Sequence, residues 1–154
     1  MQKQRGFTLI ELMVTIAIAS IILSVAIPNF IGWRPQKRLE GAASDIQGAL
    51  HMARLGALKE NSAATVNFNI DAKSYTVTVN GRIIRSGRMP TGVDLISVTN
   101  LGTATEVTTG SFVIAFNSRG LASPSVDIEV NGSGSSTSRR IRLNLSGSSK
   151  IFRN

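Results

Sequence analysis

Arg5-Gly6-Phe7-Thr8-Leu9-Ile10-Glu11-Leu12 is the stretch that decides the fold, because it opens a long apolar run directly after a short basic leader. From Leu12 to Trp33 the chain carries no charged side chain. About 20 consecutive apolar residues are enough for a helix to span a bilayer. A carboxylate at the centre of such a helix costs roughly 2.5 kcal/mol or more, and less near its end, so Glu11 is a candidate functional group. Its nearest candidate partner is the amine that a cut between Gly6 and Phe7 would create.

This stretch resembles the class III signal of type IV pilins and type II secretion pseudopilins. In that family a prepilin peptidase cuts after the glycine and methylates the new N-terminal residue. The resemblance implies that Gly6 is the cleavage position and that Phe7 becomes the methylated N-terminus. It also implies that Glu11 pairs with the amine of a neighbouring subunit during assembly. Phe7, Thr8 and Glu11 are therefore the expected assembly residues.

Two other interpretations explain part of the same stretch. A basic region followed by an apolar region also describes an ordinary secretory signal peptide, and Ser24-Val25-Ala26 is a passable cleavage site for one. That interpretation leaves Glu11 without a reason, because the apolar region of a signal peptide avoids charge. The stretch could also be a plain membrane anchor.

Charge and composition narrow the class of protein. The 154 residues have a formal net charge of +8 and contain no cysteine. Removal of residues 1–6 would leave 15 basic and 9 acidic side chains, a net charge of +6. The basic leader places the N-terminus in the cytoplasm by the positive-inside rule, so the chain is expected to cross the bacterial cytoplasmic membrane once, with its head outside that membrane, in the periplasm. The basic balance favours an acidic partner, such as anionic lipid, an acidic subunit or nucleic acid.

The helical part of the chain is expected to have two halves. Residues 7–33 read as a transmembrane or fibre-core helix that is apolar all round. Residues 34–61 read as an amphipathic helix, in which apolar residues recur every three or four positions from Leu39 to Ala57. Pro28 removes a helical hydrogen bond and is expected to kink the helix there. Two separate helices joined across Pro28 to Pro35 are the alternative.

Beyond Asn61 the period of the pattern changes to two, which predicts a β-rich head over residues 62–154. Asn80-Gly81, between two strand-like runs, favours a type I′ hairpin, because both turn positions need positive φ. The expected strands cover residues 64–70, 74–79, 82–85, 93–98, 111–116, 125–130 and 139–145, with a short last strand near Ile151. The joint over residues 131–138 is Gly/Ser-rich and expected to be mobile. A long N-terminal helix packed on an antiparallel sheet is an α+β architecture, and it is pilin-like.

The head is similar to the GspH/FimT family on Phe116-Asn-Ser-Arg119-Gly120 and on Arg140-Ile-Arg-Leu-Asn-Leu145. This family comprises the minor pseudopilin H of type II secretion and FimT-type minor pilins. The resemblance implies a structural subunit that assembles near the tip of a type II secretion pseudopilus or a type IV pilus. Its implied partners are other pilins or pseudopilins, the prepilin peptidase and the cytoplasmic membrane. Its work would be protein secretion or pilus biogenesis, and it would not be an enzyme.

DNA binding for uptake is the alternative function. The candidate contacts are the basic residues near the C-terminus: Arg139, Arg140, Arg142, Lys150 and Arg153. Strand alternation puts Arg140 and Arg142 on one face and Arg139 on the other. DNA-binding members of the family carry a Gly-Arg-x-Arg sequence, whereas this chain has Ser149-Lys-Ile-Phe152 at that place. Charges that protect an edge strand from unwanted pairing are the simpler explanation.

Residues with catalytic or metal-binding chemistry are sparse. His51 is the single histidine, and with no cysteine in the chain it has no partner for a Cys–His pair. Asp127 and Glu129 share a strand face, but two ligands fall short of the six to eight oxygens that calcium prefers. The sequence therefore predicts no catalytic residue, no metal site and no cofactor.

Overall fold

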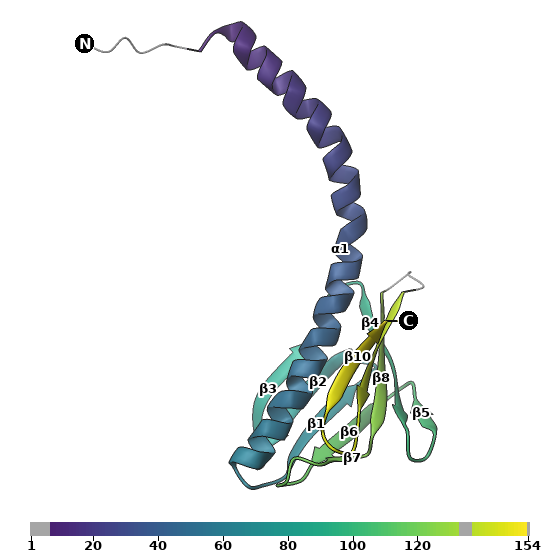
Figure 1. Cartoon of the computed structure of the whole chain (residues 1–154). Coiled ribbons are helices and arrows are strands. Elements are labelled where there is room, and N and C mark those ends of the chain that lie inside the picture. The colour runs from purple at the N-terminus through teal and green to yellow at the C-terminus, as the bar shows by residue number, and fades with distance from the viewer. Residues whose placement is uncertain (1–6, 133–136, 154) are drawn as a thin grey trace, which may run out of the picture. The chain divides into compact units, whose positions relative to one another are not determined.

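The computed structural model of the protein describes residues 7–132 and 137–153, without the side chains of residues 28–32. Within them, one long helix is followed by short strands that pair antiparallel (Figure 1). The chain divides into two compact units, with the boundary between Pro35 and Gln36. The second unit contains the last part of the helix and all of the described strands.

Helix α1 runs from Leu9 to Lys59 and has a defined end on its C-terminal side. Asn61 adopts a positive φ of 47°, and the N–H of Ser62 bonds the carbonyl of Ala57 at 3.1 Å. A left-handed residue just past the helix and a bond that reaches back over six residues form a Schellman-type cap. This cap turns the chain out of the helix and into the first strand.

The first sheet has five strands in the order β3-β2-β1-β6-β7. They are β1 (Ala64–Asn69), β2 (Ser74–Val79), β3 (Arg82–Arg88), β6 (Ser111–Phe116) and β7 (Ala122–Ser123). Asn80 and Gly81 connect β2 to β3 with φ values of 49° and 73°, as a type I′ turn requires. The register of β2 against β3 shifts between Val77 and Thr78, so β3 carries a bulge near Ile84. In the strand order, β3 forms one edge of the sheet.

The second sheet also has five strands, in the order β10-β9-β8-β4-β5. They are β4 (Val93–Asn100), β5 (Thr105–Val107), β8 (Val126–Gly132), β9 (Ser138–Leu143) and β10 (Ser149–Arg153). In this sheet β8 pairs with β9 so that Asp127 faces Arg142 and Glu129 faces Arg140. Acidic and basic side chains thus lie directly opposite each other across two neighbouring strands.

The core lies where the second half of α1 meets the two sheets (Figure 1). Eight helix residues are at most 1% exposed, namely Leu39, Ala42, Ala43, Ile46, Ala49, Leu50, Ala53 and Ala57. Five of the eight are alanines, which let the helix backbone come close to the strands. Phe68 and Phe116 of the first sheet, and Ile128 and Ile141 of the second, are fully buried in the same core. Each large apolar side chain buried in this way contributes about 1.5–3 kcal/mol.

The expected α+β architecture is confirmed, with corrections of detail. Residues 28–35 lie inside one continuous helix, so the alternative of two helices joined there is wrong. The sixth expected strand begins at Val126, and the strand expected over residues 139–145 ends at Leu143, because Asn144 starts a turn that Gly147 closes with a 2.8 Å hydrogen bond. The short strands β5 and β7 were not predicted. Residues 133–136 of the joint expected to be mobile lie outside the described residues.

Candidate functional site

The start of α1 is organised around Thr8 and Glu11. The Thr8 N–H and the Thr8 hydroxyl both donate to Oε2 of Glu11, at 3.1 and 3.0 Å. The N–H of Glu11 donates in return to the Thr8 hydroxyl oxygen at 3.3 Å. Thr-x-x-Glu with these reciprocal bonds is a capping box, which satisfies N–H groups that a helix start leaves without partners. Helix α1 therefore begins at the expected assembly residues Thr8 and Glu11.

The capping box fixes where the carboxylate of Glu11 points. Its Oε2 atom lies 3.1 Å from the backbone nitrogen of Thr8, the residue that follows Phe7. An amine at Phe7 would therefore form one residue away from the carboxylate. Phe7 itself is 79% exposed. Thr8 and Glu11 are thus brought together, Phe7 precedes them in the sequence, and Gly6 lies outside the described residues.

The apolar part of α1 is long enough to cross a membrane. Leu9–Ile27 has 19 residues with a mean hydropathy of 2.5, and none of it is buried within the structure. Its hydroxyl groups bond to carbonyls of the same helix, with Thr15 to Leu12 at 2.8 Å and Ser24 to Ile21 at 2.7 Å. A buried hydroxyl without a partner is costly in an apolar medium, so these bonds make the segment compatible with lipid. The side chain of Pro28 lies outside the described residues, and the expected kink at Pro28 stays a prediction.

Arg139 does not belong to the basic surface that was expected near the C-terminus. It is 4% exposed, on the opposite face of β9 from Arg140 and Arg142. Its guanidinium donates to the Ser138 carbonyl at 3.1 Å and pairs with Glu40 of α1 at 3.4 Å. Alternation along the strand is as predicted, but the buried side of β9 faces the helix. Arg139 therefore joins helix to sheet.

Arg142 is also occupied by a partner on its own sheet. Its Nε and Nη2 donate to the two carboxylate oxygens of Asp127 at 2.8 and 2.7 Å, and these bonds raise the pKa of Arg142 above its ordinary value. Arg142 and Lys150 lie over the ring of Phe152, at 5.6 and 5.4 Å from its centroid. Acidic residues of β8 thus lie beside the basic residues of β9, and β9 in turn lies beside the basic residues of β10. That mixture of charges weakens the attraction that a phosphate backbone needs.

No cluster for metal binding is found within the residues that the structure describes. His51 is exposed on α1 and its Nε2 lies 3.4 Å from the Ser149 hydroxyl oxygen. Of the two carboxylates of β8, Asp127 is paired with Arg142, and Glu129 lies opposite Arg140 in the strand register.

Sequence reasoning missed three features of the site. The capping box could have been found, because Thr-x-x-Glu before an apolar run is its signature. The Asp127–Arg142 pair could not, because it depends on the register between two strands that are separated by a loop. The burial of Arg139 depends in the same way on where α1 packs.

Two family models match this chain, one at its N-terminus and one mainly in its head. The sequence model described as "Prokaryotic N-terminal methylation motif" matches residues 1–27. The model described as "Type II transport protein GspH" matches residues 42–147, which is more than half of the chain.

Curated relatives match about a third to a half of this chain. The type II secretion system core protein G of Klebsiella pneumoniae is 41% identical over 58 residues, which are 36% of this chain and 41% of that protein. The protein of the same name from Aeromonas hydrophila is 36% identical over 74 residues, covering 47% of this chain and 52% of that one. The type IV major pilin PilA of Myxococcus xanthus is 42% identical over 52 residues, covering 34% and 23%. The chain thus spans about half or less of the length of these relatives.

Two solved structures have a similar fold. The type IV minor pilin FimU of Pseudomonas aeruginosa has a TM-score of 0.57 at 15% identity, covering 76% of this chain and 90% of that one. The minor pseudopilin EpsH from the type 2 secretion system of Vibrio cholerae has a TM-score of 0.57 at 12% identity, covering 75% and 97%. At these identities the likeness concerns the fold alone.

Proposed function

The chain belongs to the GspH family of type II transport proteins, and from that premise we propose that it is a structural minor subunit of a type II secretion pseudopilus or a type IV pilus. It assembles near the tip of the fibre and supports protein secretion or pilus biogenesis. The observation that carries the proposal is the combination, in one chain, of the N-terminal methylation motif with a GspH-type head. The methylation motif implies delivery of the chain through the membrane, and the GspH-type head implies that the chain is one of the minor subunits of the fibre.

Processing is the first step of the proposed role. A prepilin peptidase cuts between Gly6 and Phe7 and methylates the amine of Phe7. The exposed position of Phe7, ahead of the capped helix, supports access of an enzyme to this bond. The segment Leu9–Ile27 then remains as the membrane anchor, with the head outside the cytoplasmic membrane.

Docking by Glu11 is the second step. In the isolated chain the carboxylate of Glu11 is held by Thr8. In the fibre, the amine of a neighbouring pilin or pseudopilin approaches the same carboxylate, and the pairing sets the axial register between subunits. A charge-assisted bond in apolar surroundings is stronger than one in water, which gives the pairing its specificity.

The alternative, DNA binding for uptake, has no specific support. Arg139 is buried and Arg142 is paired with Asp127. Arg140, Lys150 and Arg153 remain as basic residues near the sheet edge, where charge also protects against pairing with other strands.

A substitution at Glu11 tests the proposal. We expect Glu11→Leu to leave cleavage and membrane insertion intact and to reduce incorporation into the fibre by at least tenfold. Glu11→Gln keeps the shape of the side chain and should behave like Glu11→Leu, whereas Glu11→Asp keeps the charge with shorter reach and should be intermediate. Intact mass gives the cleavage and methylation state, and co-purification with partner subunits gives incorporation. Wild-type incorporation of Glu11→Leu would contradict the docking role.

A further inference from the structure

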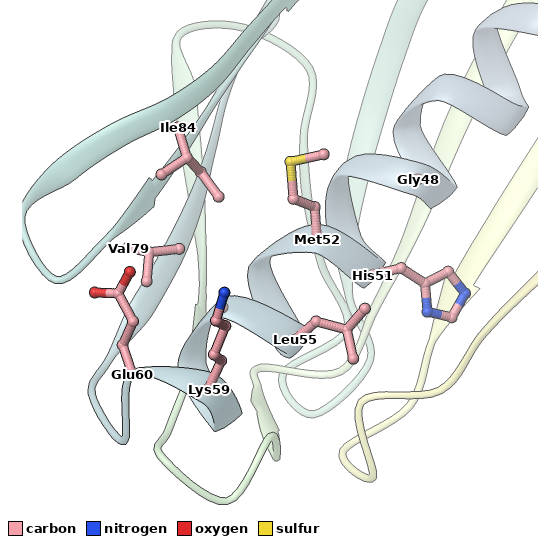
Figure 2. A pocket seen from close by; sticks show the side chains of 9 residues that line it. Gly48, His51, Met52, Leu55, Lys59, Glu60, Val79 and Ile84 are labelled. Carbon is pink, nitrogen blue, oxygen red and sulfur yellow. The ribbon is translucent and has the colours of Figure 1, made fainter.

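An apolar groove runs along the exposed side of α1 in the head. It has a volume of about 430 Å³ and lies between α1 and the strands β2 and β3. Figure 2 shows Met52 on the helix side of the groove, and Ile84 and Val79 on the strand side. Ile84 reaches this position at the bulge of β3. Met52, Leu55 and Ile84 are 37%, 64% and 43% exposed, so the groove is open to solvent.

The helix side of the groove is a second apolar stripe, separate from the buried one. Gly48, Met52, Leu55 and Lys59 follow one another at spacings of four, three and four residues. This is the spacing at which one helix presents a seam to another helix. A Cβ on Gly48 would meet only Nη1 of Arg85, at 3.9 Å, so a side chain from outside can approach the backbone there. The stripe spans about 17 Å, which is three helical turns.

The charges around the groove favour an acidic occupant. Glu60, which lines the groove, is already paired with Arg82 at 3.0 Å, and Asp45, three residues before Gly48 on α1, is paired with Arg85 at 3.4 Å. Lys59 lines the groove and is exposed (Figure 2). From residue 36 onward the chain has 14 basic and 8 acidic side chains, a net charge of +6. A second copy of this head would bring the same excess of positive charge and would be repelled.

We propose that this groove binds an amphipathic helix of a different pilin-type subunit, with an apolar stripe that enters between α1 and β3 and acidic side chains that flank the stripe. The apolar stripe of the partner covers Met52, Leu55 and Ile84, and its acidic side chains face Lys59 and the basic surroundings. Only the identity of the partner as another fibre subunit rests on the proposed function. The chemistry of the groove does not.

A designed peptide tests the groove directly. The full-length chain is placed in nanodiscs of neutral phosphatidylcholine, with empty nanodiscs as the blank. The probe is a fluorescent helical peptide of about four turns with leucines at the stripe positions and flanking glutamates. We expect saturable binding by fluorescence anisotropy, which weakens as salt is raised. Leu55→Glu should weaken binding at least tenfold, whereas Leu145→Glu, at a residue that is 59% exposed in the turn after β9, should leave it within about twofold.

Each other outcome overturns the proposal. If a peptide with lysines in place of the glutamates binds as tightly, the acidic chemistry is wrong. If neither peptide binds the wild-type chain, or if Leu145→Glu weakens binding as much as Leu55→Glu, the groove is not the site. If the chain instead self-associates through Leu55, the occupant is a second copy. Circular dichroism confirms that both variants are folded, and Ile84→Ser provides a second variant on the strand side.

The Glu11→Leu chain separates this test from that of the proposed function. It should bind the acidic peptide like the wild type, because Glu11 lies outside the groove. Failure of the Glu11 experiment would thus leave the groove result standing, and the reverse also holds.

Discussion

The two halves of α1 differ in where their apolar side chains find apolar surroundings. In Leu9–Ile27 every side chain is exposed within the structure, and nearly all are apolar. From Gln36 to Lys59 the exposed residues are mostly polar, while eight others are at most 1% exposed. The first half needs apolar surroundings from outside the chain, whereas the second half finds them on its own sheets. The continuity of α1 therefore says little about the stability of either half, because packing supplies most of the stability of a helix in a protein.

Truncation gives the largest effect and tests this contrast directly. Removal of residues 1–33 should leave a soluble, folded, monomeric β-rich head, because none of the side chains described in that segment belongs to the core. Removal of residues 1–57 should abolish folding, because it uncovers the faces of both sheets that α1 covers. Far-UV circular dichroism and urea unfolding measure both. A fragment of residues 58–154 that unfolds as cooperatively as the longer one would contradict the assigned role of α1.

Two glycines in the second half sharpen the comparison. A Cβ on Gly56 would come within 2.6 Å of Cγ2 of Val79, whereas a Cβ on Gly41 would meet nothing within 4 Å. Gly56→Ala should therefore cost about 1–3 kcal/mol in the free energy of unfolding, through overpacking. Gly41→Ala should gain about 0.5–1 kcal/mol, because alanine is the better helix former. Urea unfolding of the head tests both, and Val79→Ala should relieve part of the Gly56→Ala cost.

A smaller effect is expected from pH, at the point where α1 meets β9. The pKa of Glu40 is lowered from its ordinary value of 4.5, first by the hydrogen bond from Lys37 and also by Arg139. The carboxyl therefore stabilises the folded head above that ordinary value, and this contribution is lost as pH falls through the lowered pKa. Glu40→Gln should lower stability at pH 7, and its difference from the wild type should shrink as pH falls through the lowered pKa of Glu40.

The matched control for that measurement is Glu106→Gln, on exposed strand β5. It removes a surface carboxylate away from the helix. If the two variants show the same pH dependence, the effect is one of net charge and the contact between Glu40, Lys37 and Arg139 contributes nothing.

Local signals in the sequence predicted the elements well. The change of period near Asn61 marks the end of α1 to within two residues, and Asn80-Gly81 gives the hairpin, because both depend on neighbouring residues alone. The division into two sheets depends on long-range pairing, such as β1 with β6, and no local pattern contains it. Strands β5 and β7, with three and two residues, are too short to show a period.

The sites follow the same rule. Phe7, Thr8 and Glu11 lie within one short stretch of sequence and were predicted together, and the structure shows the bonds between Thr8 and Glu11. The basic residues near the C-terminus were predicted as one surface, yet Arg139 is buried against α1, because the helix covers that face of β9. The groove beside Met52 was missed, because it needs both the helix and the bulge of β3.

The hydroxyl groups in the first half of α1 have a consequence for transport. Thr15, Ser20 and Ser24 each donate to a carbonyl of their own helix, at 2.7–2.8 Å. They require nothing from lipid or from a neighbouring chain, so the segment can pass from one apolar medium to another without breaking a hydrogen bond. Glu11 differs, because a carboxylate retains its charge after its bonds to Thr8 are made. Movement of this segment from a bilayer into another apolar medium would therefore cost free energy mainly at Glu11. The free energy of the other residues of the segment would stay nearly constant.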